Sequence, residues 1–167
     1  MERVAVVGSG GAGKSTFARK LGERSGLPVL HLDGLFWKPG WAATPHDAWV
    51  ALQRELAAGD RWIMDGNFGS TLEVRLARAD KVIVLEPPRL VCIARAARRV
   101  LGNLGSAVQA EGCAERFDAE FFKWIWRFPR DSRPRLEAVI DQHRDHLEVV
   151  RLRSRRAVRR YLQDVAR

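Results

Sequence analysis

A parallel β-sheet covered by helices on both faces is the fold class that the sequence predicts, and two observations predict it. Short apolar runs typical of strands, the first at 3–7 and the last at 147–152, alternate with longer segments in which apolar residues recur at helical spacing. Such alternation is typical of βαβ units, which build a parallel sheet. A glycine-rich stretch, GSGGAGKST at 8–16, also follows the first run directly and opens the first helical segment. We therefore expect an α/β domain of three layers.

The stretch at 8–16 matches the phosphate-binding pattern G-x-x-x-x-G-K-[S/T]. Its residues are Gly8, Ser9, Gly10, Gly11, Ala12, Gly13, Lys14, Ser15 and Thr16. Glycines let the backbone turn its N–H groups inward and approach phosphate oxygens closely, and the start of the next helix faces the same anion. The pattern predicts that Lys14 contacts the β- and γ-phosphates of a nucleoside triphosphate and that the Ser15 hydroxyl ligates Mg²⁺. The alternative is a strand-to-helix turn without a ligand.

The remaining elements are predicted from the spacing of apolar residues. Short runs rich in such residues predict strands at 29–32, 61–64, 81–85 and 147–152. Apolar residues at helical spacing predict helices that begin after Thr44, near Ser70, after Pro88, near Phe117, near Leu136 and after Ser154. Because one sheet accommodates all of these elements, we expect a single domain over residues 1–167.

The helix that follows Pro88 is predicted to have one apolar face and one basic face. The apolar face is expected to hold Leu90, Ile93, Ala94, Ala97 and Leu101. On the basic face, Arg95 and Arg99 lie four residues apart beside Arg98, so the pair can clamp one set of phosphate oxygens. Such cations stabilise the dispersed charge of a phosphoryl-transfer transition state. A solvated basic surface is the alternative interpretation.

Size and charge narrow the functional classes. The chain has 167 residues, with 29 Lys and Arg against 20 Asp and Glu, which gives a net charge of +9. A charge of this sign favours anionic partners such as nucleotides, nucleic acids or an anionic surface. Cys92 and Cys113 lack metal-site or disulfide spacing, and no apolar run approaches the length of a membrane span. We therefore expect a cytoplasmic protein without a membrane segment.

Acidic residues follow three of the predicted strands. Asp33, Asp65 and Glu86 should converge, because the carboxyl ends of parallel strands form the ligand crevice. Asp65 is preferred over Glu86 as the acid that holds Mg²⁺ opposite Ser15, although it can also cap the following turn. Asp33 is placed to bind an acceptor or orient its hydroxyl, the alternative being an ordinary Asp-Gly turn. His31 is interpreted as a strand residue without a catalytic role.

Two segments are expected to cover this crevice. The first, at about 33–60, contains an aromatic loop in which Trp37 and Trp41 either stack on a ligand or belong to the core. The second, at about 102–134, is punctuated by glycines and is interpreted as a lid. A lid excludes water, so that an acceptor rather than water is phosphorylated.

The end of the lid segment is rich in arginine and tryptophan. Arg130, Arg133 and Arg135 can each close over the site, and Arg133 is preferred as the residue that reaches it. Trp124 and Trp126 are expected in the core rather than against a nucleotide base. The sequence thus predicts a cationic group from the lid that joins the arginines of the preceding helix.

Beyond the phosphate loop, several further motifs extend the match to a known family. They are His31-Leu32-Asp33 leading into Leu35-Phe36-Trp37-Lys38-Pro39 and Trp41, Trp62-Ile63-Met64-Asp65-Gly66-Asn67, Arg75-Leu76, Glu111-Gly112-Cys113, and Phe122-Lys123-Trp124-Ile125-Trp126 followed by Pro129-Arg130-Asp131-Ser132-Arg133-Pro134. With these, the chain resembles the adenylate-kinase-like proteins of the DNA topology modulation (FlaR-like) family nearly end to end.

This resemblance implies a branch of the nucleoside-monophosphate-kinase group. It implies a five-stranded parallel sheet of order 2-3-1-4-5, ATP with Mg²⁺, and a lid that bears arginine. Arg95 and Arg99 match the R-x-x-x-R at the base of an adenylate kinase lid, and Asp65-Gly66 matches the Asp-Gly strand end. The chain departs from adenylate kinases at 67–69, where Asn-Phe-Gly replaces Phe-Pro-Arg. The arginine contact to a monophosphate acceptor is therefore missing there, and Arg75 is its substitute.

Three functions are compatible with these features. The leading hypothesis is an ATP-dependent kinase that acts on a nucleotide or a small hydroxylated acceptor, with Asp33 and Arg75 binding that acceptor. The second is a nucleic-acid-associated regulator, which is suggested by the family name, the charge of +9 and the arginine-rich C-terminal helix, although no motif that reads DNA is present. The third is an ATPase without an acceptor.

Overall fold

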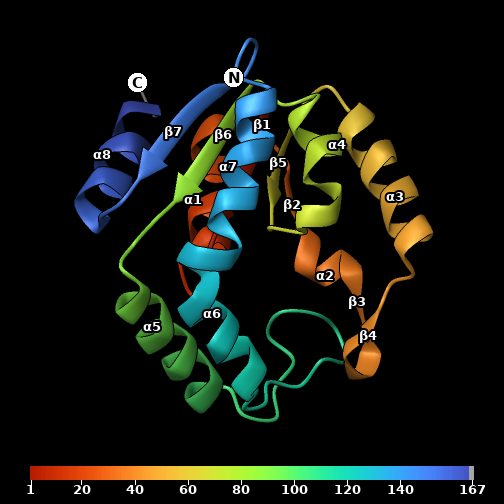
Figure 1. The fold of residues 1–167 in the computed structure, drawn as a ribbon, viewed down its shortest axis with the longest axis vertical. Coiled ribbons are helices and arrows are strands. Elements are labelled where there is room, and N and C mark those ends of the chain that lie inside the picture. The colour runs from red at the N-terminus through yellow and green to blue at the C-terminus, as the bar shows by residue number, and fades with distance from the viewer. Residues whose placement is uncertain (166–167) are drawn as a thin grey trace.

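The computed structural model describes residues 1–165 and contains a five-stranded parallel sheet (Figure 1). In chain order its strands are β1 (Arg3–Gly8), β2 (Val29–His31), β5 (Trp62–Asp65), β6 (Lys81–Leu85) and β7 (Glu148–Leu152). They lie side by side in the order β2-β5-β1-β6-β7, and every neighbouring pair is parallel. Numbered along the chain, this is the predicted order 2-3-1-4-5, which is confirmed.

Helices cover both faces of the sheet (Figure 1). The longer ones are α1 (Lys14–Ser25), α3 (His46–Ala58), α5 (Arg89–Gly102), α6 (Ala119–Asp131), α7 (Arg133–Gln142) and α8 (Arg155–Val165), and the short α4 (Leu72–Leu76) follows a 3-10 turn, η2 (Gly69–Thr71). α1 and α8 pack on one face, and α3, α4 and α7 pack on the other. No helix within residues 1–165 has the length and hydropathy that crossing a membrane requires.

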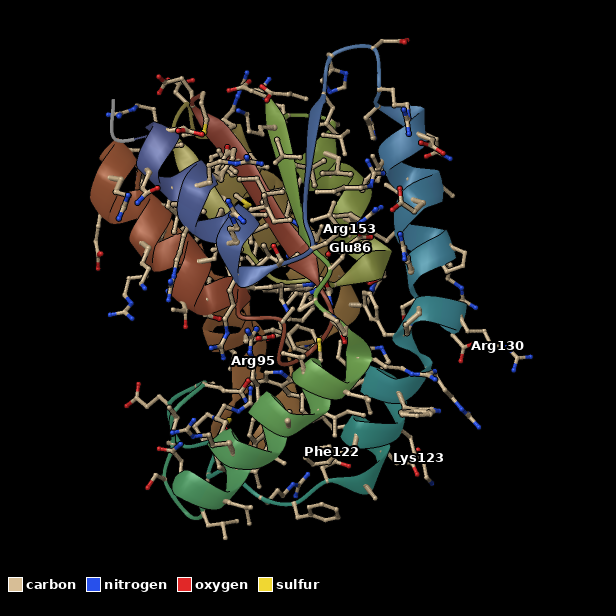
Figure 2. The ribbon with its side chains drawn as sticks, turned by 90° about the vertical axis from the view of Figure 1, so that its left-hand side faces the viewer. Glu86, Arg95, Phe122, Lys123, Arg130 and Arg153 are labelled. Carbon is tan, nitrogen blue, oxygen red and sulfur yellow. The ribbon has the colours of Figure 1, made fainter. Side chains whose placement is uncertain are left out.

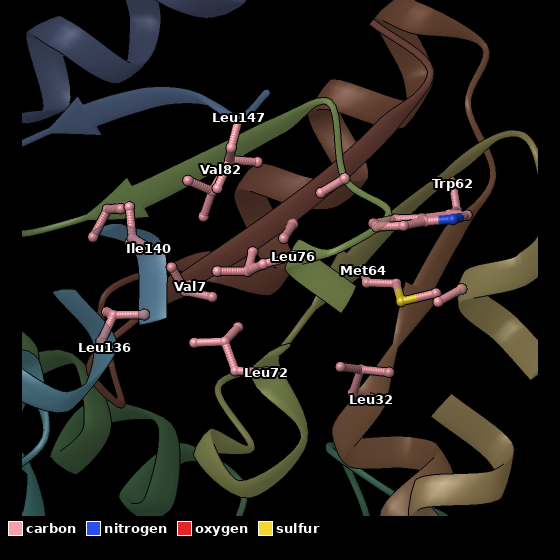
Figure 3. Packing of buried hydrophobic residues seen from close by; sticks show 14 of the residues in the cluster. Val7, Leu32, Trp62, Met64, Leu72, Leu76, Val82, Leu136, Ile140 and Leu147 are labelled. Atoms are coloured by element: carbon pink, nitrogen blue, oxygen red, sulfur yellow. The ribbon is translucent and has the colours of Figure 1, made fainter. Parts of the chain in front are cut away.

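The strands are buried on both faces, as their continuous apolar runs predict. In β1, Val4 and Val6 face the cluster beneath α1 and α8, whereas Ala5 and Val7 face the cluster beneath α3, α4 and α7, and all four side chains are fully buried. Figure 3 shows part of the second cluster, in which Val7 and Met64 meet residues from the covering helices. This packing holds the carboxyl ends of β1, β2 and β5 together at one end of the sheet.

The segment after β2 is more regular than the predicted loop. It forms α2 (Leu32–Phe36), β3 (Trp37–Lys38), the 3-10 turn η1 (Pro39–Trp41) and β4 (Ala42–Ala43), and β3 and β4 pair as a small antiparallel hairpin. Asp33 therefore lies in the first turn of a helix and not in an Asp-Gly turn. Thr44 closes the hairpin, because its backbone N–H and its hydroxyl both donate to the Phe36 carbonyl, at 3.0 and 2.6 Å.

The predicted apolar face of α5 was wrong. The buried residues of this helix are Cys92, Ala96 and Val100, whereas the predicted core residues Leu90 and Leu101 are 66% and 72% exposed. A stripe of small side chains lets α5 approach the phosphate loop closely, which a leucine face would prevent. With this face of α5 buried, Arg95 and Arg99 point toward the site.

The lid segment also differs from the prediction at both ends of α6. Phe117, expected on the helix stripe, precedes the helix and is 72% exposed, and Asp118 caps α6 by accepting from the backbone N–H groups of Glu120 and Phe121 at 2.9 and 3.3 Å. At the other end, α6 continues through Pro129, and only Ser132 separates it from α7. The two helices are therefore nearly continuous, and α7 begins three residues before the predicted start near Leu136.

Candidate active site

A cavity of about 910 Å³ lies at the carboxyl ends of β1, β2 and β5. The phosphate loop and the N-terminus of α1 form one wall, α5 forms the second, and α2 with the β3–β4 hairpin forms the third. Residues from the segment between α5 and α6 line its remaining side. This is the edge at which a parallel α/β sheet presents its ligand site, so the predicted crevice is present.

Glycine is required at two positions of the phosphate loop. Gly8 has φ +143°, and a Cβ there would lie 2.4 Å from the Leu85 carbonyl oxygen. Gly11 has φ +70°, and a Cβ there would lie 2.1 Å from the Cys92 carbonyl oxygen. Any other residue would clash with the backbone of β6 or α5. The loop can therefore pack this closely only with the glycines that the phosphate-binding pattern contains.

Lys14 and the start of α1 face the cavity. The Lys14 ammonium donates to the carbonyl oxygens of Gly8 and Ser9, at 3.0 and 3.1 Å, so it lies over the loop. Ser15 and Thr16 are exposed and line the cavity, and no side chain caps the helix at Gly13. The uncapped N–H groups and the helix dipole provide a favourable position for an anion.

Arg95 and Arg99 both line the cavity, where the sequence prediction placed them. The Arg95 guanidinium donates to the Ala12 carbonyl at 3.1 Å, which brings α5 against the phosphate loop (Figure 2). Arg99 forms an ion pair with Glu115, with 3.2 Å between Nε and Oε1, and the Glu115 side chain is only 3% exposed. Glu115 is a cavity residue that the sequence analysis missed, because nothing in its local pattern indicates burial.

The opposite wall contains Asp33, Asp65 and His31. Burial raises the pKa of Asp33, an effect that the nearby Lys14 ammonium opposes and the Asp65 carboxylate reinforces. Asp65 is 4% exposed, and its Oδ2 lies 2.9 Å from Nδ1 of His31. His31 was not expected to have a role, although its position two residues before Asp33 at the end of a strand is a signal for the crevice.

The chemistry of Ser15 and Asp65 fits the Mg²⁺ site predicted for them, which stays a prediction. The Ser15 hydroxyl and the Asp65 carboxylate line the same cavity, and oxygen donors of these two types suit this ion. Asp65 Oδ1 is buried and has no hydrogen-bond partner in the protein, whereas Oδ2 bonds His31. A buried carboxylate oxygen without a partner is costly, so a cation or its water is a fitting partner.

The His31–Asp65 pair predicts a pH-dependent stability. The hydrogen bond to Asp65 raises the pKa of His31 above 6.5, although burial lowers it. A raised folded-state pKa stabilises the protein below pH 6.5, and this stabilisation is lost as the pH rises through the folded-state value. We expect His31→Gln to lower the free energy of unfolding more at about pH 6 than at about pH 9 in urea titrations. An equal loss at both pH values would contradict the charged pair.

Arg75 does not contact the cavity, which corrects its predicted role in acceptor binding. It is fully buried, and its guanidinium donates to the carbonyl oxygens of Gly66 and Asn67. Desolvation lowers the pKa of this guanidinium to about 9, and the Asp65 carboxylate opposes that shift. α4 places Arg75 behind the turn that follows β5, so the turn and not an acceptor occupies its donors. Asn67 in that turn lines the cavity and was missed.

Comparisons with known proteins bear on the fold. No family model and no curated protein matches the sequence. A solved structure of shikimate kinase from Acinetobacter baumannii in complex with shikimate matches with a TM-score of 0.56 and 17% sequence identity, over 99% of this chain and 90% of that one. The chain therefore has the same α/β fold as this kinase. Membership of the DNA topology modulation family stays a prediction, as does any activity.

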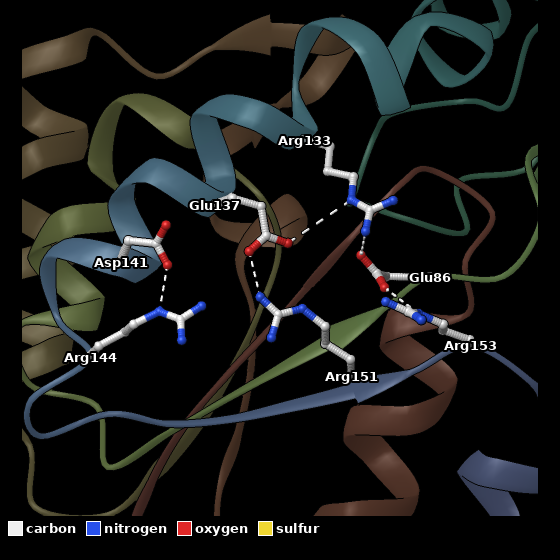
Figure 4. A network of polar contacts seen from close by, with 7 residues as sticks. All are labelled: Glu86, Arg133, Glu137, Asp141, Arg144, Arg151 and Arg153. Atoms are coloured by element: carbon white, nitrogen blue, oxygen red, sulfur yellow. Dashed lines mark hydrogen bonds and ion pairs between the residues drawn. The ribbon is translucent and has the colours of Figure 1, made fainter.

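Arg133 lies outside the main cavity, which corrects its predicted position. Its guanidinium pairs with Glu86 at 2.9 Å, and the other Glu86 oxygen pairs with Arg153 at 3.1 Å. Figure 4 shows that the network continues from Arg133 to Glu137 and on to Arg151. Glu86 therefore joins the end of β6 to α7 and the end of β7, and neither it nor Arg133 lines the main cavity.

The neighbouring arginines do not replace Arg133 in the main cavity. The Arg130 side chain is 92% exposed and points away from the body of the protein (Figure 2). Arg135 lines a second cavity, of about 480 Å³, beside η2 and α7. Phe68 and Trp124 line both cavities, so the two lie next to each other.

Four tryptophans, Trp37, Trp41, Trp124 and Trp126, divide between the cavity and the surface. Trp37 and Trp41 line the cavity and meet edge to face, with ring centroids 5.6 Å apart. Trp124 also lines it and stacks on Phe121, with centroids 5.9 Å apart. Trp126, expected in the core, is 45% exposed, and the Arg89 guanidinium lies over its ring, 3.8 Å from the ring centroid. Three tryptophans can therefore contact a ligand.

The two predicted covers touch each other. The backbone N–H of Gly40 donates to the Gly112 carbonyl at 2.9 Å, and the Trp41 indole donates to the Ala114 carbonyl at 2.9 Å. These bonds join the β3–β4 hairpin to the segment before α6, next to the cavity that both line. The lid at 102–134 and the cover at 33–60 stay predictions as functional units.

The arginine-rich helix α8 lies away from this site. Its exposed arginines within residues 1–165 are Arg155, Arg156, Arg159 and Arg160, and none of them lines the two cavities. Ser154 starts the helix as predicted, since its hydroxyl accepts from the Ala157 N–H at 3.1 Å. Nucleic-acid binding through this surface stays a prediction.

Proposed function

We propose that the protein is an ATP-dependent phosphotransferase that transfers the γ-phosphate of ATP to a hydroxyl of a small acceptor. The observation that carries this proposal is the lining of one cavity, in which the phosphate loop with Lys14 faces a half-buried carboxylate, Asp33, across the end of the sheet. A phosphate donor on one wall and a proton acceptor on the other are the two groups that this reaction needs.

The nucleotide is assigned to the wall formed by the phosphate loop. Backbone N–H groups at the start of α1 bind its phosphates, and Lys14 neutralises the charge on the β- and γ-phosphates. Arg95 and Arg99 supply further positive charge from α5. Ser15 and Asp65 hold Mg²⁺, which supplies Lewis-acid polarisation of the phosphate oxygens when it is bound.

The acceptor is assigned to the wall that contains Asp33. As the acceptor oxygen bonds to the γ-phosphorus, its proton moves to the Asp33 carboxylate, and the bond to the β–γ bridging oxygen breaks to release ADP. A pKa raised by burial suits Asp33 for this task, because a base is most effective when its pKa approaches the working pH. Trp37, Trp41 and Phe68 form an aromatic wall that can contact an apolar or planar face of the acceptor.

The covered cavity favours transfer to an acceptor over hydrolysis of ATP. Residues from the segment between α5 and α6 line it, among them Val108, Gln109 and Glu115, and the hydrogen bonds to the β3–β4 hairpin hold that segment in place. Covers of this kind limit the access of water to the transferred group. A simple ATPase gains nothing from such a barrier.

The proposal is tested by measuring ADP release from Mg-ATP with a panel of possible acceptors. The panel contains nucleosides, nucleoside monophosphates, sugars and small hydroxy acids, with shikimate among them. We expect members of one chemical class to raise ADP release at least about tenfold over the acceptor-free rate. Equal release with and without every acceptor would establish an ATPase instead, and ATP binding without any release would contradict both enzyme assignments.

A further inference from the structure

A chain of hydrogen bonds links α4 to the phosphate loop. It starts at Arg75, which is fully buried and donates to the carbonyl oxygens of Gly66, at 2.7 Å, and of Asn67. The side chain of Asn67 then pairs with both backbone groups of Gly8. Its Oδ1 accepts from the Gly8 N–H at 2.9 Å, and its Nδ2 donates to the Gly8 carbonyl at 2.6 Å.

The turn held by Arg75 has a strained backbone. Gly66 has φ +148°, and a Cβ there would lie 3.0 Å from Cβ of Leu32 and 3.1 Å from the Phe68 ring. Phe68 has φ +40°, which residues with a side chain seldom adopt. Such a conformation persists only where its surroundings maintain it. Two hydrogen bonds from one buried guanidinium to consecutive carbonyls of this turn provide that support.

Asn67 continues the sheet beyond the point where two strands separate. The pairing of β1 with β5 ends at Val6 and Asp65, and the Gly66 N–H makes the last backbone bond, to Val6 at 3.1 Å. On this side of β1, Gly8 has no backbone partner in β5, and the Asn67 amide takes that place. The Gly8 carbonyl also accepts from the Lys14 ammonium at 3.0 Å, so Asn67 and Lys14 share one acceptor.

We propose that Arg75 and Asn67 are positioning residues for the proposed transfer, on which this inference rests. Arg75 holds the turn after β5, the turn presents the Asn67 amide, and that amide fixes Gly8, from which Lys14 is aligned with the γ-phosphate. Asn67 therefore acts on the nucleotide through Gly8 and Lys14, and Arg75 acts through Asn67.

A double-mutant cycle on nucleotide binding tests this proposal. The affinities of Mg-mant-ATP and Mg-mant-ADP are measured for the wild type, Asn67→Ala, Lys14→Ala and the double variant. We expect Asn67→Ala to weaken mant-ATP binding at least about tenfold and mant-ADP binding by less, since Lys14 is the group that is misplaced. The double variant should bind mant-ATP no more weakly than Lys14→Ala alone. Independent, additive losses would overturn the proposal.

Matched variants separate positioning from a role in folding only. Asn67→Asp retains Oδ1 but loses the donor to Gly8, and it replaces Asn67→Ala in the cycle if that variant does not fold. Glu73→Gln changes an exposed residue of α4 and should bind both nucleotides as the wild type does. Equal weakening of mant-ATP and mant-ADP, accompanied by a lower melting temperature, would identify a structural role and overturn the proposal.

The Arg75 variants test the first link of the chain. Arg75→Lys retains a cationic donor but not the pair of hydrogen bonds, so it should retain more of the mant-ATP preference than Arg75→Met does. The reverse order would contradict the role of Arg75. Because these measurements record nucleotide binding, they do not depend on turnover of an acceptor. The proposed transfer activity is refuted if no acceptor raises ADP release, whereas the proposed positioning role is refuted if the coupling between Asn67 and Lys14 is absent.

Discussion

Lys14→Ala is expected to lower acceptor-dependent ADP release by about a hundred- to a thousandfold, which is the loss typical of removing one group that stabilises transition-state charge. The ammonium lies over the phosphate loop, 3.0 Å from the Gly8 carbonyl oxygen. In this position it can neutralise negative charge as that charge moves from the γ-phosphate to the leaving ADP. The measurement is the steady-state rate at saturating Mg-ATP and acceptor. The fold should be retained, because the Lys14 side chain is only partly buried and its hydrogen bonds go to the carbonyl oxygens of Gly8 and Ser9 within the loop.

Lys20→Ala provides the matched control for this variant. Lys20 lies on the same helix and is exposed, so its removal should change the rate by less than about twofold. Both variants should show the circular dichroism and melting temperature of the wild type to within a few degrees. Lys14→Ala with more than a tenth of the wild-type rate would refute the assignment of this lysine to the transfer step.

Asp33→Asn is expected to lower the turnover number by about a hundred- to ten-thousandfold, while the KM for ATP changes little. The substitution retains the size of the side chain but removes the proton acceptor from the wall opposite Lys14. In the wild type, activity should fall as the pH decreases through the pKa of Asp33, which burial raises above its usual value of 3.8. The variant should lack this acidic limb in its pH–rate profile.

The same substitution is expected to lower the activity but not the stability of the protein. Because burial raises the pKa of Asp33, its ionised form is less stable in the folded protein than in the unfolded chain. Asp33→Asn should therefore have a melting temperature at pH 7 equal to or higher than that of the wild type. Asp60→Asn, at an exposed site, is the control and should change neither the rate nor the melting temperature. A fully active, destabilised Asp33→Asn would contradict both arguments.

Local patterns predicted the phosphate loop and most of the secondary structure. The pattern at 8–16 depends on glycine conformations and on the start of a helix, which neighbouring residues determine. Strand and helix positions depend on the period of apolar residues, which differs between the two kinds of structure. The strand order came from the family resemblance, and the sheet confirms it. The phosphate loop and the positions of strands and helices therefore needed no knowledge of distant contacts, whereas the strand order was not predicted from local patterns.

The face of α5 shows where local patterns fail. Leu90 and Leu101 outweigh Cys92 and Ala96 in hydrophobicity, so the pattern favoured the leucine face, yet the smaller residues are buried. Close approach to the phosphate loop, and not the total apolar area, selects the face of this helix, since Gly11 packs against the Cys92 carbonyl. The spacing of apolar residues along a helix gives no information on the steric fit between that helix and distant segments.

By itself, the sequence determined that this protein has a parallel α/β fold with a phosphate loop and that acidic residues follow its strands. Only the tertiary structure decided which polar groups meet: the His31 side chain pairs with Asp65, 34 residues away, and the Asn67 side chain pairs with the backbone of Gly8, 59 residues away. It also decided that Arg75 supports the backbone and not an acceptor. The physical reason is that a backbone conformation depends on adjacent residues, whereas the burial and partners of a polar group depend on distant segments that only folding brings together.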